Sequence, residues 1–355
     1  MSAIENESGR GSARAVALAS AIGRFLIIAV TTYLGLLAVT FFIGRVIPID
    51  PVLAVLGDRA PLNVVERTRR EMGLDLSLVE QFYIYVKNAL SGDFGTSVLT
   101  TNPVMTDIRR ALPATTELAT LGTLIGALFG VPLGVLAAVK RGSLIDQVVR
   151  VIGLIGYSVP IFWLGLLGLV LFYAKLQWVA FPARLDVVYE YTFTPITGFY
   201  LLDSAMQGQW DVFYDAFRHI ILPASLLGYF SLAYISRMTR SFMLNELAQE
   251  YIVAARAKGL SETRVVLKYP VRAALNPFAS NIAYLFPYLV SGSVIISIVL
   301  GLPTVGPLLV KALVAKDMFL AGSIVLLLGV LTVIGTFISD LVLMWVDPRL
   351  RHQMD

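Results

Sequence analysis

The sequence contains no cysteine, which excludes disulfide bonds, thiolate chemistry and cysteine-ligated metals. It has only two histidines, His219 and His352, and they lie far apart in the chain, so a histidine-based metal cage is not expected. Charged residues are also scarce, at 15% of 355 residues, whereas 57% are hydrophobic. Ordinary soluble domains carry about a quarter charged residues. This composition predicts an all-α polytopic membrane protein.

Signatures of catalysis are also missing. The phosphate-binding Walker A motif ends in Gly-Lys, and the chain contains no Gly-Lys pair. No Ser/His/Asp or Cys/His arrangement and no metal-ligand spacing stands out. We therefore expect no catalytic residue, no metal and no cofactor on this chain. The net charge of +4 is spread over loops, so it indicates membrane orientation rather than nucleic-acid binding.

Six stretches are long and apolar enough to cross a bilayer, for which a helix needs about 20 residues. They cover roughly residues 21–46, 108–139, 145–176 (interrupted by Pro160), 218–244, 276–300 and 318–346. Residues 1–20 are expected to be a disordered cytoplasmic tail, and 47–107 an external loop with short helices. The core is expected over 108–355, with a short external turn at 301–307. Basic short loops place both termini in the cytoplasm.

Glycine and proline predict how these helices pack and bend. Glycine recurs at every fourth position in the second span, which predicts a face where another helix backbone approaches closely. These residues are Gly122, Gly126, Gly130 and Gly134. In the fifth span, Pro277 and Pro287 each remove a helical hydrogen bond. They are the candidate kink or gate positions.

The clear candidates for functional carboxylates within the predicted spans are Glu117 and Asp340. Glu117 lies towards the outer end of the second span, and Asp340 lies about two turns before the cytoplasmic tail. Ionisable residues inside a membrane often couple transport to protons or sodium. Because both lie near helix ends, interhelical hydrogen bonding or a helix-end role is the preferred interpretation. Ion coupling remains the alternative.

The loop at 245–275 is basic and lies between two spans, so it is expected in the cytoplasm. Its Ala-rich segment up to Lys258 favours a helix, and Gly259 suits the residue after a helix end. Ser261 can start a second helix. Two short helices with a break between them predict a protruding elbow that docks onto another protein.

This elbow resembles the cytoplasmic loop shared by membrane subunits of ABC importers, in which Glu-Ala-Ala is followed by three residues and then Gly. The matching residues are Val253-Ala254-Ala255 and Gly259, with Val253 where the general pattern has Glu. Further matches in order include Gly92-Asp-Phe-Gly95, Leu112-Pro-Ala-Thr-Thr-Glu117, Gly156-Tyr-Ser-Val-Pro160, His219-Ile-Ile-Leu-Pro223 and Asp347-Pro-Arg-Leu-Arg351. Together they resemble the first of two permease subunits of dipeptide or oligopeptide importers.

The resemblance implies a type I permease fold in the bacterial inner membrane. It implies three kinds of protein partner besides lipid: a second permease, two cytoplasmic ATPases that bind ATP and Mg²⁺, and an external solute-binding protein. It also implies that the elbow couples to an ATPase. The coupling residues carried over are Ala254, Ala255, Arg256, Lys258, Gly259 and Leu260. Small residues would seat the elbow, Leu260 would anchor it, and Arg256 and Lys258 would pair with acidic groups on the ATPase.

The resemblance indicates the transported solute less directly than it indicates the family. Dipeptides or short peptides are the first expectation. Relatives carry antimicrobial peptides or polyamines, haem, nickel or glutathione, and these remain alternatives. An ion-coupled carrier and a structural or sensing protein are alternatives of a different class.

Overall fold

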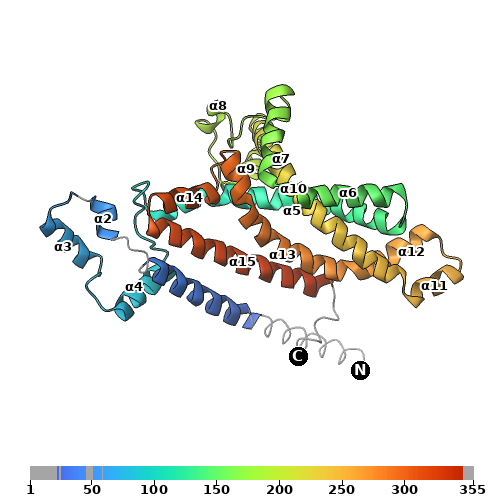
Figure 1. The fold of residues 1–355 in the computed structure, drawn as a ribbon, viewed down its shortest axis with the longest axis horizontal. Helices are drawn as coiled ribbons and strands as arrows, with labels where there is room; N and C mark the ends of the chain where they lie inside the picture. Colours follow the sequence, from blue (N-terminus) through green and yellow to red (C-terminus); the bar gives the residue numbers. More distant parts are fainter. Residues whose placement is uncertain (1–21, 24, 45–50, 58, 347–355) are drawn as a thin grey trace. The chain divides into compact units, whose positions relative to one another are not determined.

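The computed structural model describes residues 22–23, 25–44, 51–57 and 59–346, and within these it is a helical protein. The one extended pairing among the described residues is an isolated bridge between Thr96 and Pro103. The tail at 1–20 and the terminal motif from Asp347 lie outside the described residues. The helices (Figure 1) are Phe25–Gly44, α2 Pro51–Leu56, α3 Leu62–Glu71, α4 Leu78–Leu90, α5 Val104–Val139, α6 Leu144–Ser158, α7 Ile161–Gly168, the π-helix η1 Leu169–Lys175, α8 Val187–Glu190, α9 Tyr200–Met206, α10 Trp210–Leu247, α11 Glu250–Ala257, α12 Glu262–Lys268, α13 Pro270–Val299, α14 Val305–Val314 and α15 Met318–Val346.

Four described helices are long and apolar enough to cross a membrane: Phe25–Gly44, α5, α10 and α15 within Met318–Ile338. A fifth span results if α6 and the helix that follows it, Ile161–Lys175, count as one. The chain is therefore a polytopic helical membrane protein, as the composition predicts. α13 is 30 residues long, but the side chains of 274–284 are outside the described set.

The expected third span is a helix pair bent by 100°, not one helix. The bend lies at Val159, whose backbone is extended at φ −90° and ψ 125°, directly before Pro160. A residue that precedes proline is sterically disfavoured in the α region, and proline lacks the N–H that would continue the helix. The sequence locates this break but not its angle.

The chain divides into two compact units, and the first comprises residues up to Met105 together with Ala312 onward. Its small core joins the first helix, α4 and α15 through Leu37, Ala89 and Leu326. A capping box between Ser77 and Glu80 starts α4. These hydrogen bonds lower the pKa of Glu80.

Asp317 organises a second part of this unit. It is fully buried and precedes α15, where its Oδ1 accepts the Leu320 N–H at 3.0 Å. Its Oδ2 accepts the Ser97 hydroxyl at 2.6 Å and the Leu99 N–H at 3.1 Å. One carboxylate thus caps the helix and fixes the loop around residue 97, a role that the sequence analysis missed.

The second unit, Thr106–Lys311, is organised around α10. α10 packs against α6, α7, α9 and α13, and its buried positions occur along the whole helix. After α13, the sequence analysis expected only a turn at 301–307. The structure instead has a turn up to Thr304 and then the helix α14, so that expectation is wrong from Val305 onward.

Candidate functional site

The elbow consists of α11 and α12, and the break between them is a Schellman motif. The Leu260 N–H bonds to the Ala255 carbonyl at 3.4 Å, and the Gly259 N–H bonds to the Arg256 carbonyl at 2.9 Å. This pair of bonds requires a left-handed residue after the helix, and Gly259 supplies it with φ +74°. The two short helices and the break at Gly259 therefore confirm the predicted local structure.

The elbow has its own hydrophobic core. Ile252, Ala255 and Val265 are buried in it, and Leu260 and Tyr269 pack against them. Ala255 is only 5% exposed. In this structure the Ala255 methyl group faces α12 of the same elbow, and Leu260 is half-buried against the same core. The coupling role expected for these two residues stays a prediction.

The outer surface of α11 carries exposed small and apolar residues. Ala254 and Ala257 are exposed, and the Val253 side chain is 62% exposed. The sequence analysis treated Val253 only as a departure from the family pattern and did not single it out as an exposed apolar position. Helical periodicity could have indicated this exposure, because residues 253 and 257 share the face of α11 opposite Ala255.

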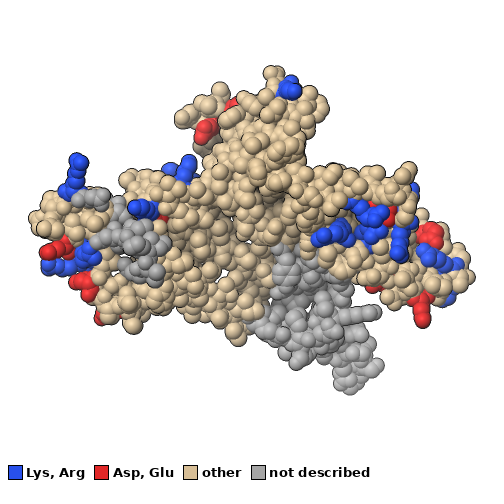
Figure 2. Space-filling model, viewed as in Figure 1, with Lys and Arg blue, Asp and Glu red and all other residues tan. Residues whose placement is uncertain are grey.

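One of the charged side chains of the elbow forms an ion pair within the loop itself. Arg256 Nε donates to Glu262 Oε1 at 2.8 Å, and its Nη2 donates to Oε2 at 3.3 Å. Arg256 is therefore already paired, whereas the sequence analysis expected it to pair with the ATPase. Lys258 is exposed beside it. Figure 2 shows Lys and Arg side chains gathered over the elbow and the adjoining end of the helices of this unit.

Tyr251 links the start of α11 to the end of α10. Its hydroxyl donates to the Glu246 carboxylate, and its ring lies 6.2 Å from that of Tyr269. Burial, together with this hydrogen bond, raises the pKa of Tyr251 to about 12. The phenol is therefore protonated and able to donate at any physiological pH.

A partly buried ion pair joins α6 to α10. Arg240 donates through Nε to Asp146 Oδ1 at 2.6 Å and through Nη2 to Oδ2 at 2.9 Å. The Gly142 N–H also bonds to Asp146. Asp146 is 1% exposed. This bidentate pair, with the Gly142 hydrogen bond, holds the basic turn at 140–142 to the helix that leads into the elbow.

The four glycines of α5 all face α10. A Cβ at Gly122 would lie 2.8 Å from Leu227 Cβ, and one at Gly126 would lie 2.2 Å from Ser231 Oγ. At Gly130 and Gly134, the corresponding nearest distances are 3.0 Å to Ile235 and 2.6 Å to the Ser236 carbonyl oxygen. A side chain at Gly122, Gly126 or Gly134 would force a shift of α10 or of its side chains, and one at Gly130 would fit only tightly.

Glu117 is buried and bound by two groups from the segment that follows η1. Arg184 Nη2 donates to its Oε2 at 2.8 Å, and the Leu201 N–H donates to Oε1 at 2.9 Å. Arg184 also bonds to the Gly198 carbonyl and lies 3.5 Å from the centroid of the Tyr200 ring. The structure thus places Glu117 in a tie between α5 and this segment.

Asp203 closes the same segment onto itself. It is fully buried, and its Oδ2 accepts the N–H groups of Ile196, Thr197 and Gly198 at 2.8 to 3.0 Å. Its Oδ1 accepts the Thr197 hydroxyl at 2.6 Å. Asp203 thus closes the turn at 196–198, and Glu117 attaches the segment 184–203 to α5.

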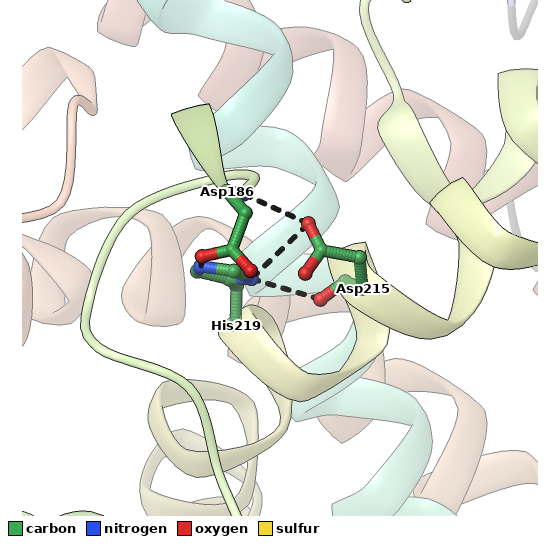
Figure 3. A group of neighbouring side chains, drawn as sticks. All are labelled: Asp186, Asp215 and His219. Carbon is green, nitrogen blue, oxygen red and sulfur yellow. Dashed lines mark hydrogen bonds and ion pairs between the residues drawn. The ribbon is translucent and has the colours of Figure 1, made fainter. Parts of the chain in front are cut away.

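A third cluster in this region joins Asp186, Asp215 and His219 (Figure 3). The His219 Nδ1 lies 2.8 Å from the Asp215 carbonyl oxygen, and its Nε2 lies 3.7 Å from Asp186 Oδ1. The Asp186 N–H donates to Asp215 Oδ2 at 2.8 Å. One potential ligand atom from each residue lies within 4.8 Å of the others. The cluster holds the start of α8 to α10. The sequence analysis did not identify it, because Asp186 is distant in the sequence from Asp215 and His219.

The remaining residues singled out from the sequence lie in α13, in α15 and near the C-terminus. The side chains of Pro277 and Asp340 lie outside the described residues, as does His352. Pro287 lies within α13 and is half-buried. The structure therefore brings Glu117 and the four glycines of α5 into defined contacts.

Comparison with known proteins agrees with this architecture. Residues 130–352 match the family model "Binding-protein-dependent transport system inner membrane component", and residues 19–119 match the model of the N-terminal part of such membrane components. The chain also resembles one subunit of a solved methionine ABC transporter, MetNI, in inward-facing conformations. The TM-score is 0.52 at 18% identity, over 68% of this chain and 97% of that one. This likeness supports a type I ABC importer permease fold.

Curated relatives match over nearly their whole length. The chain is 39% identical over 336 residues to the di/tripeptide transport system permease protein DppB of Pseudomonas aeruginosa, covering 94% of this chain and 99% of the relative. It is also 39% identical to the probable D,D-dipeptide transport system permease protein DdpB of Escherichia coli, covering 89% and 93%. The chain belongs to the family of inner membrane components of binding-protein-dependent transport systems.

Proposed function

We propose that the chain is one of two membrane-spanning permease subunits of an ATP-driven importer for dipeptides or short peptides. An external solute-binding protein delivers the peptide, and two cytoplasmic ATPases supply the energy. The chain itself carries no ATPase site. The single observation that supports this best is the near full-length similarity to two peptide permeases at 39% identity.

The elbow is the proposed contact with an ATPase. Its exposed surface on α11 comprises Val253, Ala254 and Ala257, and Lys258 and Gly259 lie at the tip. Small side chains there allow close seating in a cleft. Because α11 follows α10 after only two residues, a rigid-body shift of the elbow would move α10 and the helices packed on it.

The proposed topology has six spans with both termini in the cytoplasm. The spans are the first helix, α5, the bent pair of α6 with α7 and η1, α10, α13 and α15. The basic elbow and the basic turn at 140–142 then face the cytoplasm. The bacterial inner membrane is the corresponding location.

An ion-coupled carrier is disfavoured by the contacts of Glu117. Its two carboxylate oxygens are occupied by Arg184 and the Leu201 N–H, so the charged form is compensated within the protein. Haem, nickel, glutathione, polyamines and antimicrobial peptides are alternative solutes, and no observation on the described residues favours one of them.

Gly259 provides the test. We expect Gly259→Val to assemble but to transport poorly, because a left-handed conformation costs an ordinary residue roughly 1–2 kcal/mol, equivalent to about a 5- to 30-fold lower population of the native elbow. Gly259→Asn is the matched control, because asparagine tolerates this conformation and nothing lies within 4 Å of the added Cβ.

The measurement is ATP-dependent dipeptide uptake by the complex in vesicles, with the binding protein present and assembly checked by co-purification. Uptake should fall in Gly259→Val and persist in Gly259→Asn. Equal uptake by both variants at normal assembly would remove the coupling role. A wild-type complex that takes up another solute but no peptide would overturn the proposed substrate.

A further inference from the structure

A cavity of about 550 Å³ lies in the second unit, lined by the first turns of α5, the C-terminal end of α13, the following turn and α14. This volume falls within the range of about 300–1,000 Å³ that is usual for small-molecule sites. The turn at 300–304 that forms one wall is non-helical backbone, which membrane proteins tolerate only where it is shielded or lines a cavity.

The lining combines charge with apolar surface. Two cationic side chains, Arg110 on α5 and Lys311 on α14, line the cavity, and both are exposed. Asp107 supplies a carboxylate one turn from Arg110. Ile298 and Leu308 are among its apolar walls. This arrangement offers opposite charges and an apolar surface to one small ligand.

Two hydroxyl groups in the same lining lack a partner. The Oγ of Ser297 and the Oγ1 of Thr304 are buried and make no hydrogen bond among the described residues. Ser297 is fully buried and Thr304 is 3% exposed. A buried polar group without a partner costs free energy, so such groups are normally met by water or a ligand.

The cavity lies at the end of α13 opposite to the elbow. The elbow precedes the N-terminus of α13, and the cavity adjoins its C-terminus. Thirty residues of helix separate the two by about 45 Å. If the elbow faces the cytoplasm, as the proposed function requires, this cavity opens on the outer side, where the solute is delivered.

We propose that this cavity receives the peptide from the binding protein, and that Arg110 and Lys311 bind its C-terminal carboxylate. A guanidinium and an ammonium group together suit a carboxylate, because charge-assisted hydrogen bonds are the stronger class. The orphan hydroxyls then meet the peptide backbone, and the apolar walls meet its side chains. This inference rests on the proposed function and names the residues that would hold its substrate.

The absence of cysteine allows a charge-rescue experiment in the complete complex. Arg110→Cys and Lys311→Cys are prepared singly, with Arg109→Cys as the matched control, because Arg109 is also exposed on α5 but does not line the cavity. We expect dipeptide uptake to fall about tenfold in the first two, the effect of losing one charge-assisted hydrogen bond, and to be unchanged in the control.

Each variant is then treated with a cationic, an anionic or a neutral methanethiosulfonate reagent, with the untreated and treated wild-type complex as reference. A carboxylate-binding role predicts that only the cationic reagent restores uptake at 110 and 311. Equal effects of all three reagents, or unchanged uptake in both variants, would overturn the proposal. Wild-type uptake reports separately on the proposed function, so the two failures can be distinguished.

Protection from modification identifies the ligand. The vesicles contain only zwitterionic lipid. During turnover with the peptide-loaded binding protein, the methanethiosulfonate reagent should modify Arg110→Cys at least several-fold more slowly than Arg109→Cys. Comparison with position 109 corrects for shielding by the docked binding protein. Protection that instead requires anionic lipid and is indifferent to peptide would assign the cavity to a lipid phosphate and overturn the peptide site.

Discussion

Among single residues, Glu117 best separates the two interpretations of an intramembrane carboxylate. Its side chain is 7% exposed and that of Arg184 is 14% exposed, so the pair is largely desolvated. A carboxylate that couples an ion must change its protonation or its ligand during the cycle. Glu117 instead has both oxygens engaged by protein donors, which is the pattern of a structural tie.

This tie leads to a stability prediction. Arg184→Gln leaves Glu117 as a buried, uncompensated charge and should destabilise the protein by about 3–5 kcal/mol. Glu117→Gln combined with Arg184→Gln removes both charges and should recover much of that loss. Thermal unfolding of the purified protein in detergent measures both effects.

Arg150→Gln is the control for this experiment. Arg150 lies 3.7 Å from Asp146, but its side chain is 58% exposed, so its removal should cost no more than about 1 kcal/mol. A Glu117→Gln variant that stays as stable as wild type but loses uptake would contradict the structural role. It would revive ion coupling.

Between elements, the contact of α5 with α10 depends on the four glycines. The spacing of four residues predicts a stripe, but it does not identify the helix that the stripe meets. In the structure, the partner surface on α10 includes Leu227, Ser231, Ile235 and Thr239, which recur at the same spacing of four. The two helices therefore meet along matching rows, one of glycine and one of side chains.

We expect Gly126→Ala to be the most damaging alanine replacement along this contact. The added Cβ would lie 2.2 Å from Ser231 Oγ and 2.4 Å from Ser231 Cβ, so the helices must separate. Overpacking of this kind typically costs about 1–3 kcal/mol. The loss should appear as a lower unfolding temperature in detergent.

Gly153→Ala on α6 is the matched replacement. Its added Cβ would have only the Ala233 carbonyl oxygen nearby, at 3.8 Å, and alanine has the higher helix propensity. It should leave stability unchanged or raise it slightly. If the two variants were equally stable, the close contact between α5 and α10 would not contribute as the structure indicates.

For the molecule as a whole, the proposed topology can be tested in cells. Ser261 lies at the start of α12 and Asp75 lies in the loop between α3 and α4, and both are exposed. With both termini inside, a membrane-impermeant maleimide should label Asp75→Cys in spheroplasts. It should label Ser261→Cys only after the membrane is opened. Labelling of Ser261→Cys from outside would contradict the proposed orientation.

Local structure was predictable because its determinants are contiguous in the sequence. The break at Gly259 follows from the need for a left-handed residue, and the break at Pro160 from a missing N–H. The membrane class follows from composition alone. The helix α14 was missed because Gly301 and Pro303 end α13, and the apolar run beyond them resembles the end of a span.

Only the tertiary structure decided which residues, distant in the sequence, pair with one another. The sequence by itself determined that this is a helical membrane protein, that it carries an elbow within the loop at 245–275, and that it resembles the peptide permeases. It did not determine that Asp146 binds Arg240, that Glu117 binds Arg184, or that Ala255 faces inward. Helix periodicity predicts which residues share a face, but the choice of facing helices depends on packing across the whole fold, where no local rule applies.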